Sequence, residues 1–359
     1  NIHELWGNLI IYSDYHYGYP FYFLSMLVLL PRRILLGDAF FADKVTNIFI
    51  LRQMINVLPI IFAAVILVFY KTQFRHVFQS IFLFLLFLIL PSVVRSNIWW
   101  WHPDSLTFLF IALTFFFLQK DDYQLDKNFY LSAAMCGLAT GTKLLGVFFF
   151  LTIPVYLALA HFQHSVNWRK IVLKGFLFVC VMITVIILVN PFLWYETPRQ
   201  EMIAIQRFQQ KQLREGYSHD NPKMYQKSPI FWEWTLENWF GSILFLCFLG
   251  MSTIFGAIYE KNSHANLYLI TWSIPYLIYI FYFVAPKPDH YVFPALAPIF
   301  LTALDIPIYF YKEWKNLSWP MKGIAVVVIC IISVLLFQQI KFSIEKDIPL
   351  YRGFLRENM

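Results

Sequence analysis

The sequence predicts an all-α, polytopic membrane protein with about ten transmembrane helices. Hydrophobic residues make up 59% of the 359 residues and charged residues only 14%, whereas soluble proteins are about a quarter charged. The apolar residues also fall in long runs between short polar connections, and about 20 such residues span a bilayer. This composition excludes an ordinary soluble protein. The sequence also shows no basic module that would bind nucleic acid.

Residues 1–49 predict an interfacial segment rather than a regular span. IHELWGNLIIY has apolar residues at helical spacing and predicts a short helix on the membrane surface. FYFLSMLVLL holds only about ten apolar residues before Pro31-Arg32-Arg33, which favours an interfacial or re-entrant helix. The alternative is a tilted span ended by snorkelling arginines. Because the chain starts at Asn1 without a Met, we expect a further helix upstream.

Ten spans are predicted after this segment, within a single membrane domain of residues 1–359. A long outer loop at 194–239 separates spans 1–6, in 50–193, from spans 7–10 and the tail, in 240–359. The predicted spans are 50–70, 76–94, 104–118, 129–142, 144–161, 171–193, 240–259, 267–284, 291–311 and 323–340.

Lysine and arginine gather in alternate short connections, which predicts that those connections are cytoplasmic. The N-terminal segment, the WWWHPD loop, the long loop and PKPDHY then face the outer side, in the periplasm or a lumen. The short loops favour a bacterial inner membrane. Within the long loop, QEMIAIQRFQQKQLRE predicts an amphipathic helix.

Asp104 is the first candidate site residue, because a carboxylate at the bilayer boundary is costly unless it faces a cavity or has a function. It follows three tryptophans and His102-Pro103 and precedes an apolar run. The alternative is a helix cap, in which Asp104 only offsets the positive end of the helix dipole.

Other polar clusters lie on the same predicted side. They are Asp14 and His16 in SDYHYGYP, Lys143 at the end of AAMCGLATGTK, and Lys287, Asp289, His290 and Tyr291. Each has an alternative: a lysine at a helix end can snorkel, and His16 and His102 can be ordinary hydrogen-bonded residues. Together they fit one chemistry, because a carboxylate can deprotonate an acceptor and nearby cations can stabilise a departing phosphate.

No metal motif is present, so a divalent cation would need ligands that the fold brings together. The four cysteines lie far apart in apolar runs, which indicates packed thiols rather than disulfides or a zinc site.

The pattern resembles the GT-C superfamily of integral membrane glycosyltransferases, near the protein mannosyltransferase and lipid A aminoarabinose transferase branch. LRQMINVLPIIFAAVIL is similar to the family's second span, and HPDSLTFLFIALTFFFL to its outer loop and fourth span. CGLATGTKLLGVFFF, VNPFLW and KPDHYVFPALAPIFLTAL are similar to further family segments, and they occur in the family's order.

This resemblance implies a polyprenyl- or dolichyl-phosphate-linked sugar donor, an inverting direct displacement and an active site at the outer face. It makes Asp104 the second acid of the site and Lys143, Lys287 and His290 candidates for binding the donor phosphate. The family's main catalytic aspartate usually follows the first span, where this chain begins. Either that base lies upstream of residue 1, or Asp14 serves, or the chain is a non-catalytic relative.

Two other classes of function stay open. A lipid or solute transporter or flippase would use Asp104 and Lys143 in its pathway, although carriers place such charges near the midplane. A non-catalytic membrane subunit would only hold a partner or lipid. A transferase should gather Asp14, Asp104 and the segment from Lys287 to Tyr291 around one outer cavity that opens to lipid.

Overall fold

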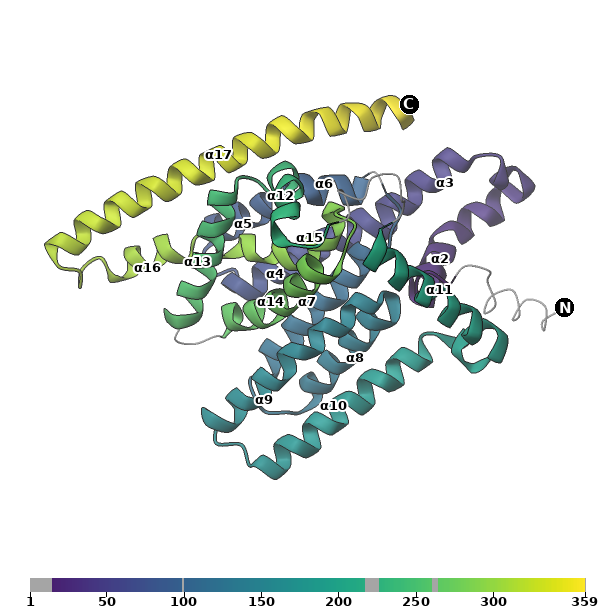
Figure 1. The fold of residues 1–359 in the computed structure, drawn as a ribbon, viewed down its shortest axis with the longest axis horizontal. Helices are drawn as coiled ribbons and strands as arrows, with labels where there is room; N and C mark the ends of the chain where they lie inside the picture. The colour runs from purple at the N-terminus through teal and green to yellow at the C-terminus, as the bar shows by residue number, and fades with distance from the viewer. Residues whose placement is uncertain (1–14, 99, 217–225, 260–263, 359) are drawn as a thin grey trace.

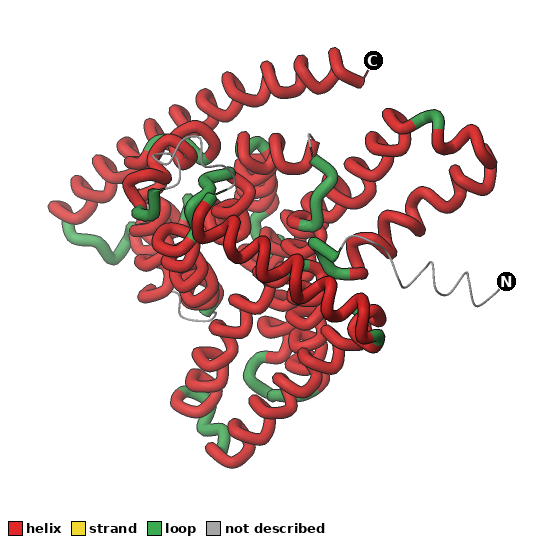
Figure 2. The backbone as a smooth tube through the Cα atoms, turned by 45° about the vertical axis from the view of Figure 1, so that its right-hand side comes forward, coloured by secondary structure: helices red, strands yellow, loops and turns green. Residues whose placement is uncertain are grey.

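The computed structural model describes residues 15–98, 100–216, 226–259 and 264–358. Within these ranges the chain forms helices joined by short connections and contains no strand (Figure 2). The predicted all-α class is therefore confirmed for this part of the chain. The surface helix predicted at 1–11 and the candidate base Asp14 fall outside the described residues.

The described chain begins with a helical hairpin of α2 (Tyr19–Leu36) and α3 (Lys44–Leu51), which projects from the body (Figure 1). α2 continues through Pro31, although the sequence predicted that the helix would end there. A proline removes one backbone hydrogen bond from a helix, and the next residue of α2 is held by contacts across the hairpin. Arg32 Nε donates to Asn47 at 2.9 Å and the Arg32 guanidinium pairs with Asp43.

α4 (Leu58–Thr72), α7 (Asp104–Asp121) and α8 (Lys127–Thr142) form the centre of the fold, and α10 (Trp168–Leu188) packs on the outside of α8. α7 packs against α4 and α8, and α8 packs against α10 (Figure 1). Gly137 makes the last approach possible, since a Cβ there would lie 2.7 Å from the backbone oxygen of Met182. The small residues of AAMCGLATGTK thus allow two helices to pack closely.

The remaining helices complete the chain on either side of this centre. They are α5 (Val77–Leu88), α6 (Pro91–Ile98), α9 (Thr152–Phe162), α11 (Glu196–Glu215), α12 (Glu233–Trp239), α13 (Ile243–Tyr259), α14 (Ala265–Phe283), α15 (Asp289–Ile299), α16 (Asp305–Glu313) and α17 (Trp319–Asn358). α11 is the helix that the long loop predicted. α17 extends for 40 residues along one side of the molecule, well beyond the predicted span of 323–340 (Figure 1).

Helices correspond to all ten predicted spans, but the described helices support only six to eight by length and hydrophobicity. Six qualify alone, and two bent pairs raise the number to eight: α5 with α6 (60°), and Pro229–Trp239 with α13 (98°). α7 and α8 account for the difference. α8 has only 16 residues, and α7 carries charged residues at both ends within its 18.

The chain is an integral, multi-pass membrane protein, and its outermost helices show the surface that lipid would cover. Only 17% of the most apolar 18-residue stretch of α10 is buried, and only 22% of the corresponding stretch of α17 is buried. Phe176 and Ile187 of α10, and Val327 and Phe337 of α17, are exposed. Such apolar faces are typical of helices in contact with hydrocarbon.

Candidate functional site

Asp104 is the first residue of α7 and is buried, with 4% of its surface exposed. The N-cap position belongs to Pro103, and no side chain caps the helix there. The carboxylate instead contacts side chains from other elements, so Asp104 does not act as the helix cap that the sequence left open. Its place in the first turn still favours the ionised carboxylate.

Asp104 pairs with one cation and one imidazole. Lys143 Nζ, at the end of α8, contacts Asp104 Oδ1, and His102 Nδ1 lies 2.6 Å from Asp104 Oδ2. On the other side of the same imidazole, the Tyr17 hydroxyl lies 2.5 Å from His102 Nε2. Burial lowers the pKa of His102 below its usual value, although the Asp104 carboxylate opposes this shift. The imidazole is therefore mainly neutral at neutral pH, and Lys143 supplies the positive charge.

Close backbone packing brings these residues together. The Gly18 N–H donates to Thr142 O at 3.0 Å, next to Lys143 in the chain. A Cβ on Gly18 would lie 1.6 Å from Gly141 O, so this approach requires a residue without a side chain. Asn190, from VNPFLW, donates to Gly141 O at 3.1 Å and accepts from Tyr19 N at 2.9 Å. These contacts fix Tyr17 and Lys143 relative to each other.

The start of α15 lies against the same cluster. α15 and α7 both begin with Pro-Asp, and the His290 ring centroid is 5.3 Å from that of His102. Asp289 is 1% exposed and its Oδ1 accepts from Arg95 Nη1 at 2.8 Å. The Arg95 guanidinium also lies 5.3 Å from the Trp100 ring centroid, so it connects α6 and the WWWHPD loop to α15.

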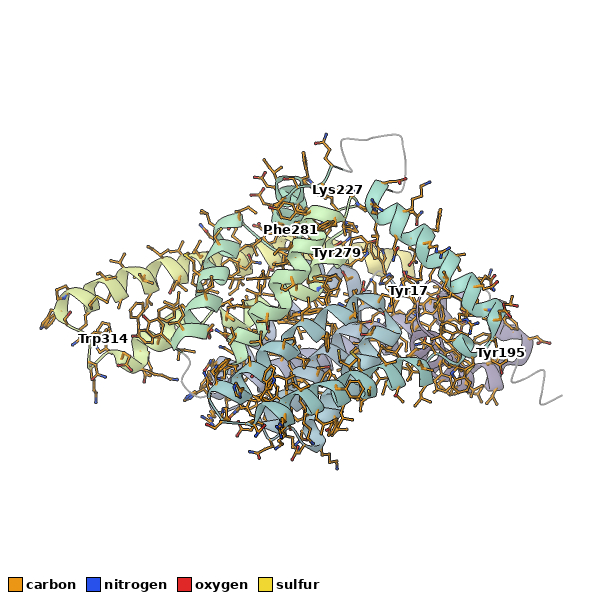
Figure 3. All side chains as sticks on the ribbon, turned by 60° about the horizontal axis from the view of Figure 1, so that its bottom comes forward. Tyr17, Tyr195, Lys227, Tyr279, Phe281 and Trp314 are labelled. Carbon is orange, nitrogen blue, oxygen red and sulfur yellow. The ribbon has the colours of Figure 1, made fainter. Side chains whose placement is uncertain are left out.

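A cavity of about 420 Å³ opens beside Lys143, between α11, α14 and the segment after α8. His16, Tyr17, Lys143 and Tyr291 line it, and Figure 3 labels Tyr17 and Tyr279 from its walls. Most other lining residues are apolar or aromatic. They include Leu144, Leu145, Val147, Phe148, Ile186, Phe192, Tyr276, Ile280 and Val284. A row of glutamines from α11 completes the lining: Gln206, Gln209 and Gln210.

The structure thus brings together His102, Asp104, Lys143 and His290, and it places His16 and Tyr291 on the adjoining cavity. Lys287 lies elsewhere: its Nζ donates to Ala285 O and lies 5.4 Å from the Trp232 ring centroid. It is not among the described residues that line the cavity.

Sequence reasoning did not select Tyr17, Arg95 or Asn190 as site residues. Arg95 was the one with a signal, because it is a charge in a predicted outer connection that otherwise carries few basic residues.

Three side chains of this cluster could in principle hold a metal ion. Ligand atoms of His102, Asp104 and His290 all lie within 4.8 Å of one another. The ammonium of Lys143, however, already contacts one Asp104 oxygen. A divalent cation would have to bind beside this positive charge, so the residues present fit an ammonium better than a metal.

No family model and no curated protein matches the sequence. Solved structures of the archaeal oligosaccharyltransferase of Archaeoglobus fulgidus have a similar fold. The structure with a tethered acceptor peptide containing the NVT sequon has a TM-score of 0.56 at 15% identity. The match covers 94% of the present chain and 47% of the archaeal chain. The apo form has a TM-score of 0.54 at 14% identity and covers 94% and 48%.

A third structure, of the same archaeal enzyme (AglB), holds an inhibitory peptide and a dolichol-phosphate. Its TM-score is 0.51 at 11% identity, and it covers 92% of this chain and 48% of that chain. The chain therefore spans about half the length of the solved structures it matches. At 15% identity or less, these similarities show that the chain shares the fold of the matched half of these structures.

Proposed function

We propose that the chain is a glycosyltransferase that moves a sugar from a polyprenyl- or dolichyl-phosphate carrier to a lipid, glycan or protein acceptor at the outer membrane face. One observation carries this proposal. The Lys143 ammonium is held by the buried Asp104 carboxylate and also lines a largely apolar cavity. A ligand with an anionic head and an apolar chain matches this combination of charge and lining.

The cavity also offers a route for such a ligand from the bilayer. Leu144 and Val147 line it and are themselves 56% and 44% exposed, on a segment predicted to span the membrane. An apolar chain could leave the cavity along these residues while its phosphate stays near Lys143. The fold supports the same carrier class, since one similar structure holds a dolichol-phosphate.

Each residue has a distinct role in the proposed reaction. An acceptor hydroxyl or amine attacks the anomeric carbon, the bond to the phosphate oxygen breaks with inversion, and a base takes the acceptor proton. Lys143 stabilises the departing phosphate, whose negative charge increases in the transition state. Asp104 and His102 position Lys143 and Tyr17. Our candidate base is Asp14, the acid of SDYHYGYP, which lies outside the described residues.

The test is a transfer assay with the full chain in lipid nanodiscs. Radiolabelled polyprenyl-phosphate sugars are incubated with membrane extract, and labelled acceptors are separated and counted. We expect transfer from at least one monophosphate donor and its loss in Lys143→Met. Lys315→Met is the matched control, because it removes the same charge from an exposed connection between α16 and α17. Absence of transfer from every donor, or full activity of Lys143→Met, would refute the proposal.

A further inference from the structure

One wall of the cavity beside Lys143 is polar, and α11 supplies it. The lining residues of this helix are Met202, Gln206, Gln209, Gln210 and Leu213. They recur at intervals of three or four residues, with Gln210 next to Gln209, so they share one face of the helix. The basic residues of α11 are not part of the lining: Arg199, Arg207, Lys211 and Arg214. The helix therefore presents uncharged amides to the cavity.

Two contacts hold α11 against the cavity. Gln206 Nε2 donates to His16 O at 3.4 Å, and His16 belongs to the same short segment as Gly18, whose N–H donates to Thr142 O. Further along the helix, Leu213 O accepts from Ala285 N at 2.7 Å, which ties α11 to the connection after α14. The two remaining glutamines lie between these contacts, so the polar wall has a fixed place in the cavity that Lys143 lines.

The side-chain amides of Gln209 and Gln210 are available to a ligand. In the part of the chain that the structure describes, neither amide forms a hydrogen bond with another residue. Each amide offers two N–H donors and a carbonyl acceptor. A sugar hydroxyl both donates and accepts, so it can satisfy both kinds of group, whereas an apolar chain can satisfy neither.

The rest of the lining divides into two parts of different chemistry. Among the described lining residues, Lys143 is the single lysine or arginine and none is a carboxylate. Leu144 and Val147 belong to an apolar wall that is itself partly exposed. One cation, one apolar wall and one amide wall match the phosphate, the polyprenyl chain and the sugar of a single donor.

The charges of the lining also discriminate between kinds of sugar. A sugar that carries an ammonium would lie beside Lys143 without a carboxylate partner among the described lining residues, and like charges repel. A sugar that carries a carboxylate would compete with the donor phosphate for the same ammonium. An uncharged sugar has neither disadvantage.

We propose that Gln209 and Gln210 recognise hydroxyl groups of the donor sugar, and that this sugar is uncharged. The inference rests on the proposed function and adds its substrate class. The two glutamines determine specificity and take no part in bond making or breaking. The sugar lies along α11, the phosphate lies at Lys143, and the polyprenyl chain leaves along Leu144 and Val147.

Binding of carrier lipids with and without a sugar tests this inference. The purified full chain in maltoside detergent is loaded with radiolabelled farnesyl phosphate, which is then displaced by unlabelled ligands. The ligands are farnesyl phosphate itself and its mannosyl, glucosyl, glucosaminyl and glucuronosyl esters, at a slightly acidic pH where the amine of glucosamine is protonated. We expect at least one uncharged sugar to bind about tenfold more tightly than farnesyl phosphate, and the two charged sugars to show no such gain.

The double variant Gln209→Leu/Gln210→Leu removes the amides and keeps residues of similar size that form helices well. Loss of a hydrogen bond between uncharged groups weakens binding about threefold to tenfold. The variant should therefore lose most of the gain from the sugar, while its affinity for farnesyl phosphate stays unchanged. Gln200→Leu is the matched control, because Gln200 is an exposed residue of α11 that does not line the cavity. It should bind every ligand as the unmodified protein does.

The outcomes separate this inference from the proposed function. If farnesyl phosphate binds but no uncharged sugar adds affinity, the inference is wrong and the carrier site stands. The same holds if a charged sugar binds most tightly, or if the gain from the sugar persists in the double variant. If farnesyl phosphate does not bind at all, the proposed carrier is wrong, and the sugar site that depends on it is wrong as well.

Discussion

The two ends of α7 each bury an aspartate, but in different surroundings. Asp121 accepts from the backbone N–H groups of Leu125, Asp126 and Phe129 at 2.9 to 3.2 Å, and from the Tyr156 hydroxyl. Asp104 is contacted by the side chains of Lys143 and His102. Asp121 thus uses neutral donors that mostly come from the next few residues, whereas Asp104 uses groups that can carry charge, one of which borders a cavity.

From this difference we propose a structural role for Asp121 and a functional role for Asp104. The partners of Asp121 fix the connection between α7 and α8, because three of its four contacts are to backbone in that segment. The contacts of Asp104 leave the backbone unconstrained and instead hold an ammonium where a ligand can reach it. Burying a charge costs free energy even when the charge is paired. A buried ion pair beside a cavity therefore favours a role in function.

The largest expected effect is that of Asp104→Asn on transfer. Without the carboxylate, Lys143 loses the partner that positions it, and we expect the rate to fall at least about a hundredfold, as for the loss of one preorganised transition-state contact. The measurement is the initial rate of sugar transfer per folded molecule, with folding checked by size-exclusion chromatography. Asp121→Asn is the matched control and should retain its rate per folded molecule. A normal rate in Asp104→Asn would end the distinction between the two aspartates.

For stability we expect the opposite order, with a larger loss in Asp121→Asn than in Asp104→Asn. Asp121→Asn replaces an ionised acceptor with a neutral one that has a single carbonyl oxygen, and hydrogen bonds to charged groups contribute about 1.5–3 kcal/mol. We therefore expect a clear decrease in the Tm of the detergent-solubilised protein, measured by intrinsic fluorescence. The decrease should exceed that of Asp104→Asn, whose neighbour Lys143 can still be hydrated from the cavity. Equal Tm values for the two variants would show that Asp121 does not stabilise its connection.

The sequence predicted the Asp104 end better than it predicted the Asp121 end. Asp104, Lys143 and His290 were selected from the Trp-rich flank, the Pro-Asp helix start and the charge distribution. Polar groups are costly in a bilayer, so the few that occur between apolar runs indicate a site. The sequence analysis did not select Asp121, since its partners are mostly backbone N–H groups of a turn, which no sequence motif indicates. Arg95 and Tyr17 were missed for a similar reason, because their partners are 194 and 85 residues away.

The helices were predictable in type but not in extent. Hydropathy located a helix at each predicted span, yet α7 and α8 pack at the centre of the fold and are too charged or too short to qualify as ordinary spans. α2 continues through Pro31, and the next residue, Arg32, contacts Asn47 of α3. Hydropathy does not contain such tertiary contacts.

A smaller effect tests whether the proposed donor site at the Asp104 end of α7 includes Lys287. Burial, with the nearby Lys227, lowers the pKa of Lys287 to about 8. If its ammonium contacts the donor phosphate, donor affinity should decrease several-fold as the pH rises through about 8, because the deprotonated amine no longer attracts an anion. Donor affinity measured between pH 6.5 and 9.5 should lose this step in Lys287→Met, and acceptor affinity should change less. Unaltered donor affinity in that variant would remove Lys287 from the phosphate site.

The smallest expected effect is that of divalent cations on the unmodified protein. Lys143 occupies one Asp104 oxygen, so Mn²⁺ would have to bind His102, Asp104 and His290 beside an ammonium, and like charges at such distances repel. We expect EDTA to leave transfer unchanged and electron paramagnetic resonance to show no bound Mn²⁺. Removing the ammonium should reverse this result: Lys143→Met should bind Mn²⁺, and the double variant with Asp104→Asn should not. Tight Mn²⁺ binding by the unmodified protein would mean that a metal displaces Lys143 from Asp104. Asp104 would then differ from Asp121 as a metal ligand and not as a partner in an ion pair.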